Sequence, residues 1–225
     1  MCSEAVNIPT WPYDKLYYIN ETSNTTDKTH YLVRMLAKFK IENKKITATS
    51  TLYNYFIEEV SIVNGSIDGL ACYKEANWDG TKNRVTVPSL PTSPATKSTK
   101  ANANKFTYTP TWGGSGAIPT QTIIELYGFE TKQADDVVNN MTTNCYLLLK
   151  GKRVDNSSTP VVETDIEYML PVYKIVADGT GWKGDIGYAG DVLRNHVYHY
   201  TISGVQKHAL NATLTVRQWT NVAIS

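Results

Sequence analysis

Four histidines are the first residues to consider for chemistry in this chain of 225 residues. His196 and His199 lie three residues apart, and the run that begins between them, Val-Tyr-His-Tyr-Thr-Ile, is typical of a β-strand. An odd spacing places two strand residues on opposite faces, so this pair cannot chelate one metal ion. His30 and His208 have no carboxylate at ligand spacing. We therefore predict no metal site among the histidines.

Three carboxylates form the next candidate group. Glu163, Asp165 and Glu167 alternate with uncharged residues and would share one face of a strand. Same-face neighbours on a strand are about 6.5–7 Å apart, too far to converge on one calcium ion, so we interpret the row as a solvent-exposed face. The glycine-rich stretch 178–187 lacks the order of a calcium loop, and we interpret it as a turn region.

Ser115 is the one candidate nucleophile, because it lies in Gly-Gly-Ser-Gly-Ala, a run similar to a hydrolase nucleophile elbow. Its surroundings are Pro-rich and do not form the strand-to-helix turn that an elbow requires. No phosphate-binding loop, dinucleotide fingerprint or His-Glu-x-x-His motif occurs. We expect a protein that is not an enzyme and that uses no cofactor.

Three tryptophans have binding potential of another kind. Trp78, Trp112 and Trp182 lie beside Gly, Asn and Asp in loop-like contexts. Such rings can stack on sugars or on a partner surface, and they can equally close the ends of a sandwich core. The sequence leaves both interpretations open.

The elements that must position these residues are predominantly β-strands. In the segment 33–41, apolar Val33, Met35, Ala37, Phe39 and Ile41 alternate with mostly cationic residues, which predicts a half-buried strand. Further runs rich in Val, Ile, Thr and Tyr predict strands at 53–63, 121–129, 144–151, 161–176, 197–206 and 211–219. Seven or more strands indicate an all-β sandwich, with at most a short helix at 131–141.

Composition limits the possible partners. Lys and Arg total 22 against 21 for Asp and Glu, so the net charge of +1 favours neither nucleic acid nor anionic membranes. No run is long and apolar enough to span a bilayer, and no signal peptide is visible, so we expect either a cytoplasmic protein or one whose export signal has been removed. Tyr occurs 15 times against 4 Phe, and we expect these rings on strands, with their hydroxyls in water.

The chain also suggests a domain organisation. Residues 88–120 contain five prolines and a Ser/Thr-rich middle, which predicts a long loop that either binds a partner or acts as a tether. Residues 1–30 are polar and irregular, and we interpret them as a linker or as the remnant of a preceding domain. The predicted sandwich domain covers residues 31–225.

Two segments near the C-terminus resemble a known family. One holds the motif Arg-Asn-His-x-Tyr at Arg194, Asn195, His196 and Tyr198, and the other ends the last predicted strand at Trp219. Together they resemble the C-terminal signature of the fimbrillin family, the type V pilins and fimbrial adhesins of Bacteroidales. Segments 33–38 and 125–131 are similar to two further family elements, Arg-x-x-Ala-Lys and an aromatic-Glu strand end.

The resemblance implies a transthyretin-like or Greek-key β-sandwich without catalysis. It further implies a structural and adhesive subunit that is exported as a lipoprotein precursor and lies at the outer membrane in a cell-surface fimbria. Accessory and tip positions are among the places in the fimbria that the resemblance allows. Its implied partners are other pilin subunits, bound by donor-strand exchange, and a host protein or glycan. The alternative is a carbohydrate-binding sandwich that uses the three tryptophans. We expect Arg194, Asn195 and His196 to be structural, with Arg194 and Asn195 bonding loop carbonyls.

Overall fold

The computed structural model of the chain describes residues 2–3, 30–33, 36–43, 53–69, 96–108, 122–133, 142–155, 162–177, 182–194, 196–218 and 223–224. Every regular element in these ranges is a strand. The described residues contain no helix that is long and apolar enough to cross a membrane. The strands are β1 (Cys2–Ser3), β2 (His30–Val33), β3 (Leu36–Asn43), β4 (Tyr53–Val63), β5 (Lys105–Thr107), β6 (Thr122–Phe129), β7 (Tyr146–Asp155), β8 (Val162–Pro171), β9 (Tyr173–Ala177), β10 (Trp182–Ala189), β11 (His196–Val205), β12 (Leu210–Gln218) and β13 (Ala223–Ile224).

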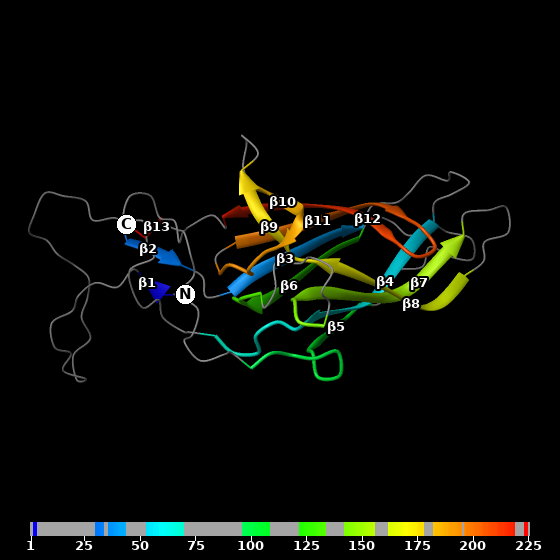
Figure 1. Cartoon of the computed structure of the whole chain (residues 1–225), viewed down its shortest axis with the longest axis horizontal. Coiled ribbons are helices and arrows are strands. Elements are labelled where there is room, and N and C mark those ends of the chain that lie inside the picture. Colours follow the sequence, from blue (N-terminus) through cyan, green and yellow to red (C-terminus); the bar gives the residue numbers. More distant parts are fainter. Residues whose placement is uncertain are drawn as a thin grey trace, which may run out of the picture.

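Two large sheets form a sandwich, as predicted. One has six strands in the order β6-β3-β11-β12-β10-β9, and the other has four in the order β5-β4-β7-β8. All neighbours are antiparallel except β3 and β11, which run parallel. A small sheet, β1-β2-β13, lies beyond one end of the sandwich (Figure 1).

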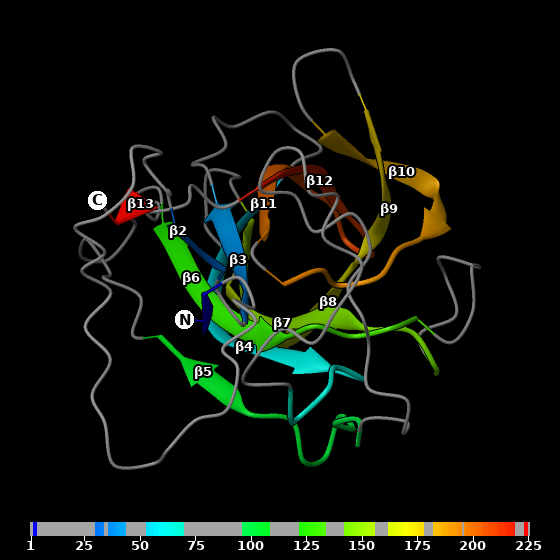
Figure 2. The same cartoon turned by 90° about the vertical axis from the view of Figure 1, so that its left-hand side faces the viewer.

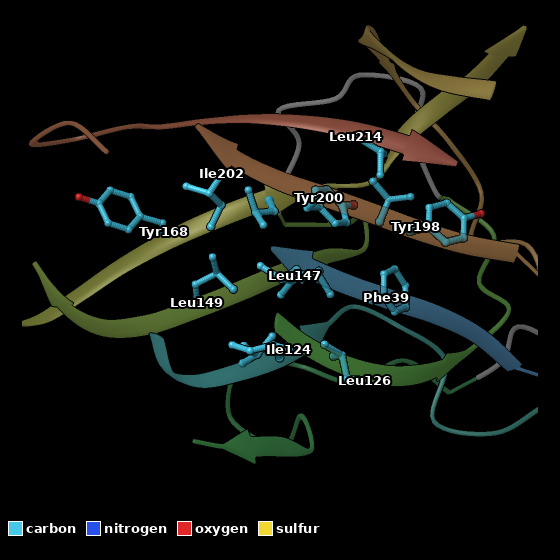
Figure 3. Packing of buried hydrophobic residues seen from close by; sticks show 14 of the residues in the cluster. Phe39, Ile124, Leu126, Leu147, Leu149, Tyr168, Tyr198, Tyr200, Ile202 and Leu214 are labelled. Carbon is cyan, nitrogen blue, oxygen red and sulfur yellow. The ribbon is translucent and has the colours of Figure 1, made fainter. Parts of the chain in front are cut away.

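The core lies between the facing sides of the two sheets. Figure 2 shows the strands curving around this shared interior, and Figure 3 shows the side chains that fill it. On β3 the alternation is complete, because Ala37, Phe39 and Ile41 have no exposed surface while the residues between them are half-buried. They pack in one cluster with Leu147 and Leu149 of the opposite sheet. Burial of such apolar side chains is the main stabilising term of a sandwich.

Buried tyrosines correct the expectation of hydroxyls in water. Tyr55, Tyr198 and Tyr200 are at most 1% exposed. Their hydroxyls donate to backbone carbonyl oxygens within the protein, for example from Tyr55 to Ile166 and from Tyr200 to Pro171, both at 3.0 Å. These hydroxyls would bond to water at the surface, and inside the fold they donate their hydrogen bonds to backbone carbonyl oxygens instead.

The predicted strand at 161–176 is wrong as a single element. It divides at the buried Val172 into β8 and β9, which belong to different sheets. The chain thus passes from one layer to the other at this point, directly after Pro171, which has no N–H to continue a ladder. This crossing links the two sheets covalently along one side of the sandwich.

The predicted turn region at 178–187 is also wrong, because residues 182–189 form strand β10. Gly184 pairs with Ile175 of β9, and a Cβ on Gly184 would lie 2.9 Å from the Cβ of Tyr173. Glycine here makes room for a neighbouring side chain in a sheet, and it does not mark a turn.

Two further predictions need correction at their edges. The described part of the predicted loop 88–120, residues 96–108, contains the short strand β5 and a bridge between Lys97 and Ser66, whereas residues 88–95 and 109–120 lie outside the described residues. The predicted helix 131–141 does not begin at Thr131, which forms a β-bridge with Val192, and residues 134–141 lie outside the described part of the chain.

Candidate functional site

Two loop segments are joined at one end of the six-stranded sheet. Residues 130–133 follow β6, and residues 190–194 connect β10 to β11; we call these two segments the clasp. Thr131 and Val192 exchange two backbone hydrogen bonds, with N···O distances of 3.0 and 2.9 Å. This antiparallel bridge brings together positions about sixty residues apart in the chain.

A buried ion pair lies inside the clasp. The guanidinium group of Arg194 donates through Nε to Glu130 Oε2 at 2.7 Å and through Nη2 to Glu130 Oε1. The side chains are only 2% and 1% exposed, respectively. Two charges this deep are tolerated only when they are paired with good geometry, and the two-pronged contact supplies that geometry.

Gln133 ties the clasp to the opposite sheet. Its backbone N–H donates to Asp191 Oδ1 and its side-chain Nε2 donates to the Gly190 carbonyl, both at 2.8 Å. Its Oε1 accepts the backbone N–H of Cys145 at 2.7 Å, just before β7 begins. One side chain thus satisfies polar groups from two separate segments.

Tyr198 of β11 binds the clasp segment 190–194 through its hydroxyl. Its hydroxyl accepts the Leu193 N–H at 2.7 Å and donates to the Asp191 carbonyl at 3.0 Å, while its ring stacks on Phe39 with centroids 5.3 Å apart. Burial raises the pKa of Tyr198 far above its ordinary value. The hydroxyl therefore stays protonated and can keep both hydrogen bonds.

His196 completes this set of contacts. Its Nδ1 lies 2.8 Å from the Arg194 carbonyl oxygen. A carbonyl can only accept, so Nδ1 carries the proton. The contact orients the ring at the first residue of β11.

The predicted motif residues have the following places in the structure. Arg194, His196 and Tyr198 come together in the clasp, whereas Asn195, Trp219, Trp78 and Trp112 lie outside the described residues. Trp182 begins strand β10 and does not lie in a loop, since it pairs with Ala177 and Val216.

Arg194 was predicted to bond loop carbonyls, and the structure gives it a carboxylate partner, Glu130. The sequence interpretation missed Glu130 and Gln133 as its neighbours in the clasp. A signal for Glu130 was present, since it ends the aromatic-Glu segment 125–131. That segment and the Arg-Asn-His-x-Tyr motif meet directly.

The free edge of β6 is the second notable feature. β6 is an edge strand whose Ile124 and Leu126 are fully buried, while Ile123 and Tyr127 are 51% and 44% exposed. Lys38 of β3 pairs with Glu125 at 2.7 Å on the outer face. An edge strand with apolar side chains on both faces can pair with a further strand.

Tyr108, just after β5, is the residue that reaches this edge. Its backbone N–H donates to the Glu58 carbonyl at 2.6 Å, and its hydroxyl is hydrogen-bonded by the Glu125 backbone. Burial raises the pKa of Tyr108, while that hydrogen bond acts in the opposite direction. Because strand amides alternate in direction, the amides of Ile123 and Tyr127 face the same side of β6 as that of Glu125.

The outer face of the four-stranded sheet carries a charged ladder and a hollow. Glu167 contacts Lys100 at 2.5 Å and Lys150 at 3.2 Å, and Glu58 contacts Lys152 at 3.0 Å. The hollow has a volume of about 570 Å³ and is lined by Glu58, Glu59, Thr107, Tyr108, Lys150, Gly151, Asp165 and Glu167. No group of three or more potential metal ligands occurs among the described residues.

The sequence matches no protein-family model, and a comparison with curated proteins finds no match. Among solved structures, one similar chain is described as a "putative cell adhesion protein" from Parabacteroides distasonis, with a TM-score of 0.43 and 18% identity over 84% of this chain. A second is the tip fimbrial protein Mfa3 from Porphyromonas gingivalis with C-terminal truncation, with a TM-score of 0.42 and 11% identity over 83% of this chain. The similar regions span 60% and 52% of those two chains.

Proposed function

We propose that this chain is a structural and adhesive subunit of a bacterial surface fimbria that joins other subunits by accepting an added strand. One observation carries the proposal. The segments that resemble the fimbrillin family are far apart in the sequence, yet Glu130 of one and Arg194 of another form a buried pair within a single β-sandwich. The resemblance therefore corresponds to one three-dimensional arrangement.

The proposal extends to localisation and organisation. The subunit is exported, as the resemblance implies, from a lipid-modified precursor to the outer membrane and the cell surface. Residues 31–225 form the pilin-like domain, and residues 1–30 are a linker or the remnant of a preceding domain. The role is non-catalytic.

The edge of β6 is the proposed site of strand addition. The two edges of the sandwich differ, since the chain itself crosses between sheets at Val172 on one side, whereas β6 and the three-residue β5 form the borders of the other. A partner strand with alternating apolar residues would pair with backbone groups along this edge, beginning with the Glu125 amide. It would displace the Tyr108 hydroxyl from the Glu125 amide.

Strand addition is testable with peptides that copy the terminal segments of candidate partner subunits. At a peptide concentration of 100 times Kd, we expect stabilisation of about 2.7 kcal/mol, seen as a higher melting temperature. Glu125→Pro removes the edge-facing N–H without removing a β3 hydrogen bond, so it should abolish the shift. Glu125→Thr is the matched control, because it also loses the Lys38 contact but keeps the N–H.

Equal peptide responses in the Pro and Thr variants would contradict addition at β6. The absence of a shift with every tested segment would count against the fimbrial function itself. For the alternative carbohydrate platform, no described geometry favours the tryptophans, because Trp182 is the only one of the three within the described ranges and it belongs to β10.

A further inference from the structure

The outer face of the six-stranded sheet gathers cationic side chains on three adjacent strands. Lys38 and Lys40 lie on β3, His199 on β11 and Arg217 on β12. The register places Lys40 beside His199, and both Lys38 and Arg217 beside Val197. Neighbouring strands are about 4.7–4.9 Å apart, so these groups span about 10 Å across the sheet. We call these four residues the cationic row.

Carboxylates neutralise only part of the cationic row. Lys38 pairs with Glu125 at 2.7 Å, and Nε2 of His199 lies 3.0 Å from Glu42 Oε2. Lys40 and Arg217 make no ion pair within the described part of the chain. Both are near enough to His199 to lower its pKa. Glu125 also lies opposite Lys40 in the register of β3 and β6, so the three cations Lys38, Lys40 and Arg217 share this face with the two carboxylates Glu42 and Glu125, which leaves one surplus positive charge among these residues.

The rest of this face is rich in hydroxyl groups and poor in apolar surface. Thr213 and Thr215 of β12 and Ser203 of β11 are exposed on the same side. Exposed large apolar residues on this face lie at its border on β6, where Tyr127 pairs with Lys38 and Ile123 with Glu42, and none is described on β3, β11 or β12. Protein interfaces depend on central aromatic and aliphatic anchors, and the part of this face on β11 and β12 carries charged and hydroxyl groups instead.

We propose that this face binds an acidic polysaccharide, with its sulfate or carboxylate groups at Lys40 and Arg217 and its sugar hydroxyls at Thr213 and Thr215. Guanidinium and ammonium groups form strong charge-assisted hydrogen bonds with such anions. Threonine hydroxyls can both donate to and accept from sugar hydroxyls. The site is distinct from the tryptophan platform and from the β6 edge.

His199 makes this binding pH-dependent. The groups that face it are Lys40 and Glu42 on β3 and Arg217 on β12. A bound anion offsets the two cations, so binding raises the pKa of His199 and affinity increases as the pH falls. The polysaccharide thus binds the protonated imidazole better than the neutral one.

The test measures binding of the whole chain to dextran sulfate, polygalacturonate and neutral dextran at about 0.15 M salt. Dextran sulfate carries sulfate groups and polygalacturonate carries carboxylate groups, so the two polymers show which anion the face binds. We expect binding to at least one of them and none to dextran. Lys40→Gln/Arg217→Gln should weaken binding at least about tenfold, because two charge-assisted hydrogen bonds are lost.

The matched control is Lys100→Gln/Lys152→Gln, which removes the same charge from the opposite sheet and should change affinity less than about twofold. His199→Gln should keep binding at neutral pH and lose its increase at lower pH. The imidazole NMR signals report the same event directly, since His199 should titrate at higher pH with the polysaccharide present.

Three results would overturn the proposal: no binding beyond that of dextran, equal weakening by both double variants, or equal binding of polyglutamate, which would assign the face to an acidic protein. This measurement does not involve strand addition. A failure here leaves the Glu125→Pro experiment untouched, and the reverse also holds.

Discussion

At the scale of single residues, the Glu130–Arg194 pair has a large free-energy cost, because two charged groups are buried in the folded protein. Each charge loses its hydration on folding, and the opposite charge of its partner offsets that loss. The pair also anchors the loop before β11, because the Arg194 carbonyl accepts from His196. Removing one partner should therefore lower the free energy of unfolding by more than the intact pair contributes to it.

We expect Glu130→Gln or Arg194→Met to lower the free energy of unfolding by about 3–5 kcal/mol, since each leaves a buried charge uncompensated. The double variant Glu130→Leu/Arg194→Met should cost less than the sum of the single changes. Urea denaturation of all three variants measures this difference.

Lys38→Gln serves as the control, because its contact with Glu125 is partly exposed and worth at most about 1 kcal/mol. Single variants of the clasp that unfold like this control would show that the clasp contributes little to stability.

At the scale of elements, the four-stranded sheet is shaped by irregularities on both sides of Gly151. The register with β4 shifts between Ile57 and Glu59, and the register with β8 shifts beside Gly151. Asp165 on β8 has a φ of 58°, a left-handed conformation. Bulges of this kind redirect side chains, and these two lie at the hollow on the outer face.

Gly151 is required by close backbone approach, since a Cβ there would lie 1.8 Å from the Phe56 carbonyl oxygen. We expect Gly151→Ala to destabilise the protein by about 2–4 kcal/mol, because β4 and β7 must separate. Gly204→Ala is the matched control. Its Cβ would meet the movable Asn211 side chain at 3.0 Å, so the cost should stay below about 1 kcal/mol.

Thermal and urea unfolding of the two alanine variants give the comparison. Similar stabilities for both would mean that the β4–β7 pair can adjust without loss.

At the scale of the whole molecule, buried tyrosines connect stability to pH. Burial raises the pKa of Tyr55, Tyr198 and Tyr200 well above the ordinary value of 10.0. The folded state thus keeps these phenols neutral where the unfolded chain would ionise them. Their contribution is fully present below pH 10 and is lost as the pH rises further.

We expect the free energy of unfolding to fall above pH 10 by about 1.4 kcal/mol per pH unit for each of the three tyrosines. Urea titrations at increasing pH, followed by phenolate absorbance, measure the slope. Tyr200→Phe should reduce the slope by about 1.4 kcal/mol per pH unit. A slope that Tyr200→Phe leaves unchanged would contradict the role of this buried phenol.

Much of the fold follows from the sequence because strand periodicity is a local property. The alternation at Ala37, Phe39 and Ile41 predicts a strand and its buried face, and the run 53–63 predicts β4 to its ends. The resemblance to fimbrillins also depends on local motifs. These patterns were sufficient for the all-β sandwich.

Only the tertiary structure decided which distant segments meet. The division of 161–176 at Val172, the strand β10 and the partner of Arg194 depend on contacts between residues far apart in the chain. No local pattern encodes that Gly184 makes room for Tyr173, or that Glu130 lies against a guanidinium 64 residues away. Periodicity determines which side of a strand is buried, whereas packing determines what that side is buried against.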